Sequence, residues 1–295
     1  MDNLNMFLEY LEVIKKYSEN TINSYRIDIE ELLEFTTNKK INYINITKKE
    51  VNSYLEYLYN KDIDKNTISR KLSSLRSFYN YLLNKEIISY NYFNLIHNPR
   101  HQVKLPNYLK EEELDKMFSV PDIESPLGVR NRLILEILYA TGVRVSELVN
   151  IKISDINFDN RTIKILGKGN KERMVVYGNH CNEILELYLN SYRKELLKNK
   201  SNDYLLLNKN GNQITTRMIR NILDDIILKC SLDKHVYPHM IRHSFATAML
   251  NNGADIISVK ELLGHESVNT TTIYTHVTNE RLKEVYNNAH PRAKE

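Results

Sequence analysis

The chain has 295 residues, which is long for a single compact domain and predicts two domains. Hydrophobic residues make up 42% and charged residues 26%, and these ordinary globular values exclude a wholly disordered or collagen-like chain. The net charge of +4 and the pI of about 8.7 fall short of the strongly basic composition of a dedicated nucleic-acid-binding domain.

The sequence carries no sign of membrane insertion or export. No segment approaches the about 18 consecutive apolar residues of a transmembrane helix, and the first twenty residues are acidic where a signal peptide is basic and then apolar. Neither Cys181 nor Cys230 belongs to a CxxC pair, which argues against a disulfide framework or a Cys-based zinc site. We therefore expect a cytoplasmic protein.

The first hundred residues are predicted to be helical. All eight glycines lie at or after Gly128 and all six prolines at or after Pro99, so this stretch lacks the residues that most often interrupt helices. Apolar residues recur at helical spacing over 6–14 and again over 22–33. These patterns predict the first two helices of a bundle.

Two further helices are predicted from capping patterns. Thr47 and Glu50 have the spacing of a capping box and open a helix that runs through Tyr59. Asn66 or Thr67 is expected to cap a fourth helix. The N-terminal part is thus predicted to be a bundle of about four helices.

The fourth predicted helix lies in a locally basic stretch. Residues 61–80 contain five lysines and arginines against two aspartates, an excess that can contact DNA phosphates. The candidates for such contacts are Arg70, Lys71 and Arg76. The alternative is a solvated helix face with no ligand.

A domain boundary is expected where prolines first gather. Four of the six prolines lie between Pro99 and Pro126, and the sequence between 98 and 109 is typical of an extended linker. We expect an N-terminal domain over 1–98, a linker over 99–108 and a second domain over 109–295.

The second domain is predicted to be helical with a small β-hairpin. A strongly apolar helix ends at Gly142, and two β-prone runs, 161–166 and 173–178, are joined by a glycine-containing turn. Helices resume at Pro238, and the last is an amphipathic piece over 280–288. The fold class is therefore mainly α with a small β-sheet, in two domains.

The start of the helix after Pro238 carries candidate chemistry. His239 and His243 share a helix face, as zinc ligands do in HExxH enzymes, but Met240 stands where that chemistry needs glutamate. His239 and Arg242 are instead an i, i+3 pair that joins a proton-transfer group to a permanent cation. The alternative is that these are polar residues solvated at a helix start.

Two more cations lie at turns. Arg144 follows the apolar helix and suits an anion site, although a capping or solvated arginine is the simpler alternative. Lys168 lies between two glycines at the tip of the predicted hairpin, where it could reach into a cleft. Walker A binding of ATP is excluded as an explanation because GxxxxGK[ST] occurs nowhere in the chain.

With two later motifs, LLGH and IYTHV, these residues resemble the tyrosine recombinase family, and closely its Xer members of the XerC/XerD type. The resemblance covers nearly the whole chain, including NTINSYRIDI and NTISRKLSSLRSFYNYLLNK in the N-terminal part and HPRAKE at the end. It implies a SAM-like core-binding bundle followed by an α+β catalytic domain. The positions that match the family's catalytic signature are Arg144, Lys168, His239, Arg242, His265 and Tyr274.

The resemblance also implies a mechanism. Tyr274 would attack the scissile phosphate, with His239 as its base and Lys168 protonating the 5′-hydroxyl leaving group. Arg144, Arg242 and His265 would stabilise the transition state, so that neither a metal ion nor ATP nor another cofactor is needed.

The biological role implied by the resemblance is resolution of chromosome dimers at a dif-like DNA site during cell division. The partners implied are that DNA, a homo-oligomer or heterotetramer with a sister Xer recombinase, and a DNA translocase as regulator. The protein would then be nucleoid-associated, and residues 280–295 of one protomer would pack on its neighbour.

Three other functions are weighed against this one. A type IB topoisomerase has similar catalytic residues but gives no reason for the Xer-like tail. A DNA-binding protein with a vestigial site does not account for six matching residues. Among metal-dependent nucleases, His-x-His types are disfavoured because no two histidines are two apart, whereas a carboxylate cluster built in three dimensions stays open.

Overall fold

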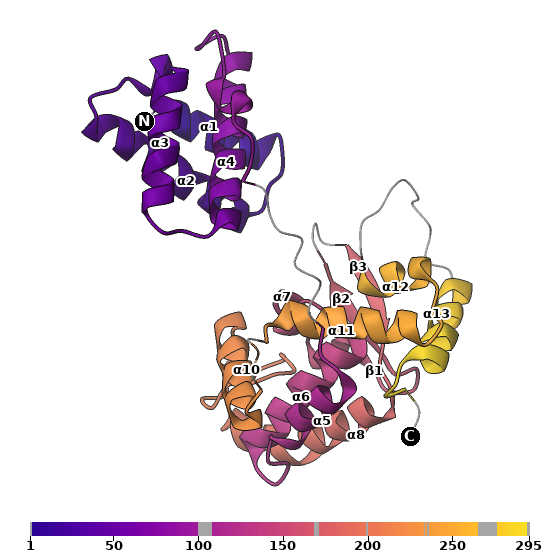
Figure 1. The fold of residues 1–295 in the computed structure, drawn as a ribbon. Helices are drawn as coiled ribbons and strands as arrows, with labels where there is room; N and C mark the ends of the chain where they lie inside the picture. The colour runs from indigo at the N-terminus through magenta and orange to yellow at the C-terminus, as the bar shows by residue number, and fades with distance from the viewer. Residues whose placement is uncertain are drawn as a thin grey trace. The chain divides into compact units, whose positions relative to one another are not determined.

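The computed structural model describes residues 2–99, 108–167, 171–198, 200–232, 234, 236–264 and 276–293. The chain forms two compact units, Met1–Lys104 and Leu105–Glu295, which are treated separately below. Both are mainly helical (Figure 1), and in the described part no helix is long and apolar enough to cross a membrane.

The first unit is the predicted four-helix bundle. Its core is built from apolar residues at helical spacing, including Phe7, Ile29 and Leu72, all fully buried. A short turn at Tyr92–Leu95 closes the unit against α3 and α4. The helices are α1 (Asp2–Val13), α2 (Glu19–Asn38), α3 (Lys48–Asn60) and α4 (Lys65–Asn84).

The two capping predictions had different outcomes. The Thr47 N–H donates to Glu50 Oε2 at 2.9 Å, so the capping box of α3 is confirmed. The expected cap of α4 is wrong by two residues or more, because the Asp64 carboxylate accepts from the Asn66 N–H at 2.8 Å. Aspartate caps helices as well as asparagine does, and the earlier position begins α4 at Lys65.

The second unit is built around α6, most of whose residues are buried. Helix α6 packs against α8 and α11 and contacts α5, so it forms the centre of the larger core. Figure 1 shows α11 running across this unit in front of the strands. The helices are α5 (Glu111–Ser119), α6 (Pro126–Thr141), α7 (Val145–Leu148), α8 (Asn179–Leu187), α9 (Arg193–Leu197), α10 (Thr216–Cys230), α11 (Pro238–Asn251), α12 (Ile256–Leu263) and α13 (His276–Ala289).

A small antiparallel sheet lies beside these helices in the order β1-β2-β3, with β1 at Ile156–Asn157, β2 at Thr162–Leu166 and β3 at Glu172–Val176. The predicted hairpin of β2 and β3 is confirmed, with Leu166 paired to Glu172. The short strand β1 is an addition that the sequence did not predict.

The C-terminal helix α13 packs against α11, α12 and β3 of its own unit. The predicted amphipathic piece over 280–288 is part of this longer helix. In this single chain, the segment beyond it, His290–Ala293, is also docked on the same unit, with His290 4% and Ala293 7% exposed.

Candidate active site

The candidate site is organised by a sharp corner at the end of α6. Gly142 caps the helix with φ of +60°, in the left-handed region that glycine enters at little cost. A Cβ at Gly142 would lie 2.8 Å from side-chain atoms of both Phe245 and Leu263. Glycine therefore lets the corner approach both α11 and the end of α12, and it delivers Arg144 to the start of α7.

Arg144 is held along one edge by a buried carboxylate. Its backbone N–H donates to Glu147 Oε2 at 2.8 Å, and its Nη1 donates to Oε1 at 2.9 Å. The Arg144 side chain is 36% exposed, and in the described part of the chain no bond is recorded for its Nε or Nη2. These donors can therefore receive an anion from solvent.

Arg242 joins the same corner from α11. It is 7% exposed, its Nη1 donates to the Gly142 carbonyl, and its Nη2 donates to the Leu263 carbonyl at 2.7 Å. Both carbonyls lie at helix C-termini, where backbone acceptors lack partners within the helix and a cation is stabilised. Arg242 thus joins the ends of α6 and α12. Its two acceptors, Gly142 and Leu263, each precede a candidate site residue, Arg144 and His265, by two positions.

The corner has an excess of positive charge. Burial, followed by the charge of Arg144 and by that of Arg173, lowers the pKa of Arg242 to about 10, against the effect of Glu147. Arg242 remains cationic at neutral pH, so the charges of three guanidinium groups, those of Arg144, Arg173 and Arg242, meet only one carboxylate, that of Glu147. Such an arrangement suits a phosphate diester.

His239 lies on the first turn of α11, which begins with Pro238 at a position that tolerates a missing N–H. It is exposed and precedes Arg242 by three residues, so the two side chains occupy one side of the helix. The structure thus places His239 and Arg242 on α11 and Arg144 at the corner against which α11 packs.

Lys168, His265 and Tyr274 lie outside the described residues. The neighbours of two of them are described, since Gly167 follows β2 and Gly264 caps α12. Both glycines adjoin the side chain of Arg173. Tyr274 lies two positions before the start of α13.

Sequence reasoning missed Glu147 and Arg173, which bind each other in this site. Glu147 has the i+3 spacing from Arg144 that a capping pattern requires, and this signal could have found it. Arg173 alternates with Val175 on the buried face of β3, where a charged residue is unusual. A charge at a core-facing strand position is therefore the signal that was available.

The residues of α4 predicted to contact DNA differ in how far they are exposed to solvent. Lys71 is 7% exposed, and its Nζ lies 3.3 Å from Asp28 Oδ1 and also contacts Glu31. Arg70 also contacts Asp28, but its side chain is 47% exposed. Lys71 therefore joins α2 to α4 within the bundle, and Arg70 keeps a surface that a phosphate can reach.

Arg76 is engaged with the end of the first unit. Its Nε donates to the Phe93 carbonyl at 3.1 Å, and its Nη2 donates to the Ile96 carbonyl at 2.6 Å and to Asn98 Oδ1 at 2.8 Å. These bonds fix the path of the chain after residue 92, which is a structural role.

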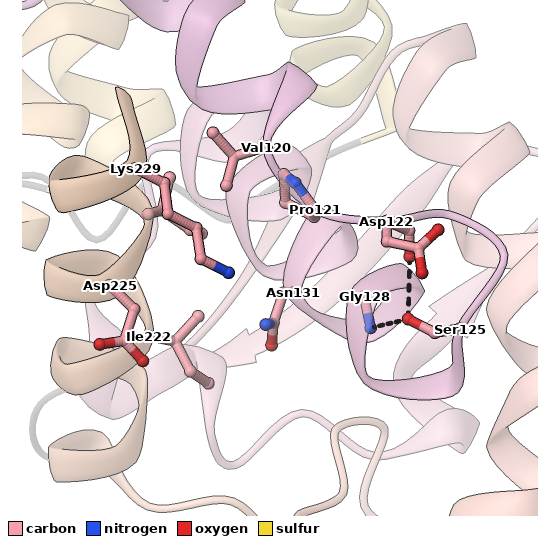
Figure 2. Close-up of a pocket in the computed structure, with 10 residues that line it drawn as sticks. Val120, Pro121, Asp122, Ser125, Gly128, Asn131, Ile222, Asp225 and Lys229 are labelled. Atoms are coloured by element: carbon pink, nitrogen blue, oxygen red, sulfur yellow. Dashed lines mark hydrogen bonds between the residues drawn. The ribbon is translucent and has the colours of Figure 1, made fainter. Parts of the chain in front are cut away.

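A pocket of about 240 Å³ that opens to solvent lies elsewhere in the second unit. Figure 2 shows it between α10 and the start of α6, with Lys229 pointing toward Asn131 and with Ser125 hydrogen-bonded to Asp122 and Gly128. The described site candidates do not line it. Among the described residues, no three His, Cys, Asp or Glu side chains gather as metal ligands would.

Comparison with known proteins places both units in one family. The phage integrase family model matches residues 107–281, and the model of the phage integrase N-terminal SAM-like domain matches residues 4–86. Tyrosine recombinase XerC of Anoxybacillus flavithermus is 44% identical over 293 residues, 98% of each chain. XerC of Bacillus subtilis is 42% identical over 98% of this chain and 96% of its own.

A solved structure agrees with this result. XerH site-specific recombinase, crystallised on a palindromic difH substrate, superposes with a TM-score of 0.70 at 30% identity, covering 90% of this chain and 79% of its own. The expected fold class is confirmed by this match and by both family models. Because the family models and the full-length relatives cover both units in order, the chain belongs to the phage integrase family and is a site-specific tyrosine recombinase that transfers DNA strands.

Proposed function

We propose that this enzyme cuts and rejoins DNA through a 3′-phosphotyrosine at Tyr274. The observation that carries this proposal is the cationic corner, where Arg144 and the buried Arg242 converge. The scissile phosphate would bind at the exposed donors of Arg144, and His265 would donate a further hydrogen bond.

The chemistry requires proton transfer at two oxygens. A phenol with a pKa of about 10 is almost fully protonated at neutral pH, so Tyr274 needs a base, which we assign to His239. Attack on phosphorus forms the Tyr–phosphate bond and expels the 5′-oxygen, which Lys168 protonates. Charge that develops on the non-bridging oxygens is stabilised by fixed cations, each donor typically contributing ~3–4 kcal/mol. A 5′-hydroxyl from a second strand then reverses the reaction and reseals the DNA.

We assign the substrate as a dif-like chromosomal site, and the role as resolution of chromosome dimers before cell division. Support comes from full-length relatives named XerC and from the likeness to XerH bound to difH. The two units would bind one duplex together, with Arg70 contacting a phosphate. The enzyme would act on the nucleoid in the cytoplasm.

Recombination would take place in an oligomer on two sites, formed by this chain alone or with a sister recombinase, and a DNA translocase would regulate it. Exchange of 280–295 between protomers would first have to break the contacts of His290 and Arg292 within their own unit. Those contacts would keep the free protomer from engaging a neighbour before DNA assembles the oligomer.

The test uses a nicked suicide duplex carrying a dif-like site, incubated without metal or ATP and resolved on a denaturing gel. Wild type should form a covalent adduct, and Tyr274→Phe should form none because the nucleophile is missing. Tyr192→Phe, at a partly buried tyrosine of the same unit, is the matched control and should retain the adduct. An adduct with Tyr274→Phe would assign the nucleophile to another residue.

A further inference from the structure

Arg173 is a charged residue at a strand position whose side chain faces the core. It shares the buried face of β3 with Val175 and pairs across the hairpin with Ile165. The residue is 9% exposed. Its Nη1 and Nη2 donate to Glu147 Oε1 and Oε2 at 3.0 and 2.8 Å, a bidentate pair that fixes the carboxylate in two directions.

Glu147 receives Arg144 on the same two oxygens. Four donors therefore converge on one carboxylate, two from Arg144 and two from Arg173. Burial raises the pKa of Glu147, but the hydrogen bonds and charges of Arg173 and Arg144 outweigh it and leave the pKa below its usual value. Glu147 stays ionised and links the two arginines.

The Arg173 side chain also lies close to two glycines, Gly167 and Gly264, which directly precede Lys168 and His265. A Cβ added at Gly264 would lie 2.7 Å from Arg173 Nε and 2.8 Å from its Cδ. A Cβ added at Gly167 would lie 3.4 Å from Nη1. The chain therefore passes close to Arg173 just before position 265 and just before position 168.

The Arg173 Nε is buried and has no hydrogen-bond partner in the described part of the chain. An unpaired buried donor disfavours folding, and a buried ion pair adds little net stability over apolar packing. The side chain therefore serves to fix positions. It makes two hydrogen bonds to Glu147, and it lies close to Gly167 and Gly264.

We propose that Arg173 is a positioning residue for strand transfer: by clamping Glu147 it holds Arg144 in place for the scissile phosphate, and it packs close to Gly167 and Gly264, which directly precede Lys168 and His265 in the sequence. The inference rests on the proposed function, in which Arg144 binds that phosphate. Arg173 itself does not touch the DNA. Its loss should therefore slow the chemical step and leave duplex affinity nearly unchanged.

The experiment measures single-turnover cleavage of the nicked suicide duplex at saturating enzyme, together with duplex affinity. Arg173→Met should lower the cleavage rate constant about 10²-fold, the effect of misplacing a catalytic group by about 1 Å. Arg173→Lys keeps the charge but loses the bidentate geometry, so its cleavage rate constant should lie between those of wild type and Arg173→Met. Glu147→Gln should resemble Arg173→Met, and the double variant should be no slower than either, because both act through Arg144.

Arg193→Met is the matched control. Arg193 is 6% exposed in the same unit and donates to the backbone carbonyls of Asn202, Tyr204 and Leu205. Its loss should lower Tm while folded protein cleaves at the wild-type rate. Millimolar guanidinium should restore cleavage by Arg173→Ala, and it should not change the rate of Arg193→Ala.

Two results would overturn the inference: rate losses that multiply in the double variant, or a wild-type cleavage rate in folded Arg173→Met and Arg173→Lys. Failure of the proposed function looks different. It would appear as adduct formation by Tyr274→Phe, whereas the Arg173 variants are expected to reach the same adduct as wild type, only more slowly.

Discussion

Arg292 and Glu136 form an ion pair that ties the C-terminal tail to the central helix α6, with Nη2 2.7 Å from Oε1. Glu136 is 1% exposed, and its Oε1 also accepts from Arg132 Nε at 2.9 Å. The backbone of the tail lies so close to Gly178 that a Cβ there would be 2.3 Å from the Arg292 carbonyl oxygen. The tail therefore packs as part of the core.

Arg292→Met should destabilise the second unit. The substitution leaves a buried carboxylate with one cation in place of two, at a cost of about 2 kcal/mol, smaller than for a fully unpaired charge because Arg132 remains. In a domain of this size the loss corresponds to a fall in Tm of roughly 4–8 °C. Thermal unfolding followed by circular dichroism measures it.

Arg281→Met is the control for that prediction. Arg281 is 61% exposed and lies 3.8 Å from the half-exposed Asp255, a surface pair that contributes little. Its Tm should stay close to that of wild type. Equal shifts in the two variants would mean that the tail contact contributes no more than a solvent-screened pair.

His290 should make stability depend on pH. Its Nδ1 accepts from the Arg292 N–H at 3.1 Å, so Nε2 carries the proton and donates to the Tyr139 carbonyl at 3.3 Å. Protonation of Nδ1 would set two donors against each other. Burial, together with the charge of Arg292, lowers the pKa of His290 to about 3 despite the Tyr139 carbonyl.

Because the folded pKa lies below the unfolded value of about 6.5, the unfolded chain takes up the proton first. The contribution of His290 to the free energy of unfolding is fully present above about pH 6.5. Below that pH it falls by about 1.4 kcal/mol per pH unit. His290→Phe keeps an aromatic ring against Tyr286 but cannot titrate. The stability advantage of wild type over this variant should therefore shrink by about 2 kcal/mol between pH 7 and pH 5, and a constant difference would refute the assignment.

Local features of the fold were predictable, and pairings across the sequence were not. The ends of α6 and α12 follow from Gly142 and Gly264, because a left-handed C-cap depends on one residue. The hairpin follows from β-prone runs around a glycine turn. In contrast, the Glu147–Arg173 pair joins residues 26 apart, and no short-range pattern specifies it.

The site was predictable to the extent that it resembles a motif. Arg144, His239 and Arg242 were found because the family signature names them, whereas residue type and spacing alone favoured solvated or capping roles. Lys71 shows the limit of charge counting, since a basic stretch predicts a phosphate surface whether its lysine faces solvent or contacts a buried aspartate and a partly buried glutamate. The direction of a side chain around a helix decides between these outcomes.

Lys71 and Arg70 should separate folding from DNA binding. Lys71→Met removes a buried cation from Asp28 and Glu31 and should destabilise the first unit by about 1–3 kcal/mol. Arg70→Met removes a half-exposed cation and should reduce the slope of log affinity against log salt concentration by about one. Salt titrations of duplex binding measure the slope.

For Lys71→Met, that slope should equal the wild-type slope once the protein is folded. A reduced slope in Lys71→Met, or an unchanged slope in Arg70→Met, would show that the roles inferred from burial are assigned to the wrong residues.

Gly142→Ala should impair both folding and catalysis, because the corner needs a left-handed backbone and space for two neighbours. Alanine at φ of +60° costs about 1–2 kcal/mol, and the 2.8 Å approach to Phe245 and Leu263 adds roughly 1–3 kcal/mol of overpacking. Movement of the Gly142 carbonyl would also displace Arg242, which donates to it. Cleavage by the folded fraction should therefore fall along with Tm.

Gly253→Ala separates backbone strain from crowding by neighbours, since Gly253 has φ of +90° but open space around its Cβ position. It should lose stability from backbone strain alone and cleave DNA at the wild-type rate, and a matching loss of cleavage in both variants would remove the corner's link to Arg242 as the explanation.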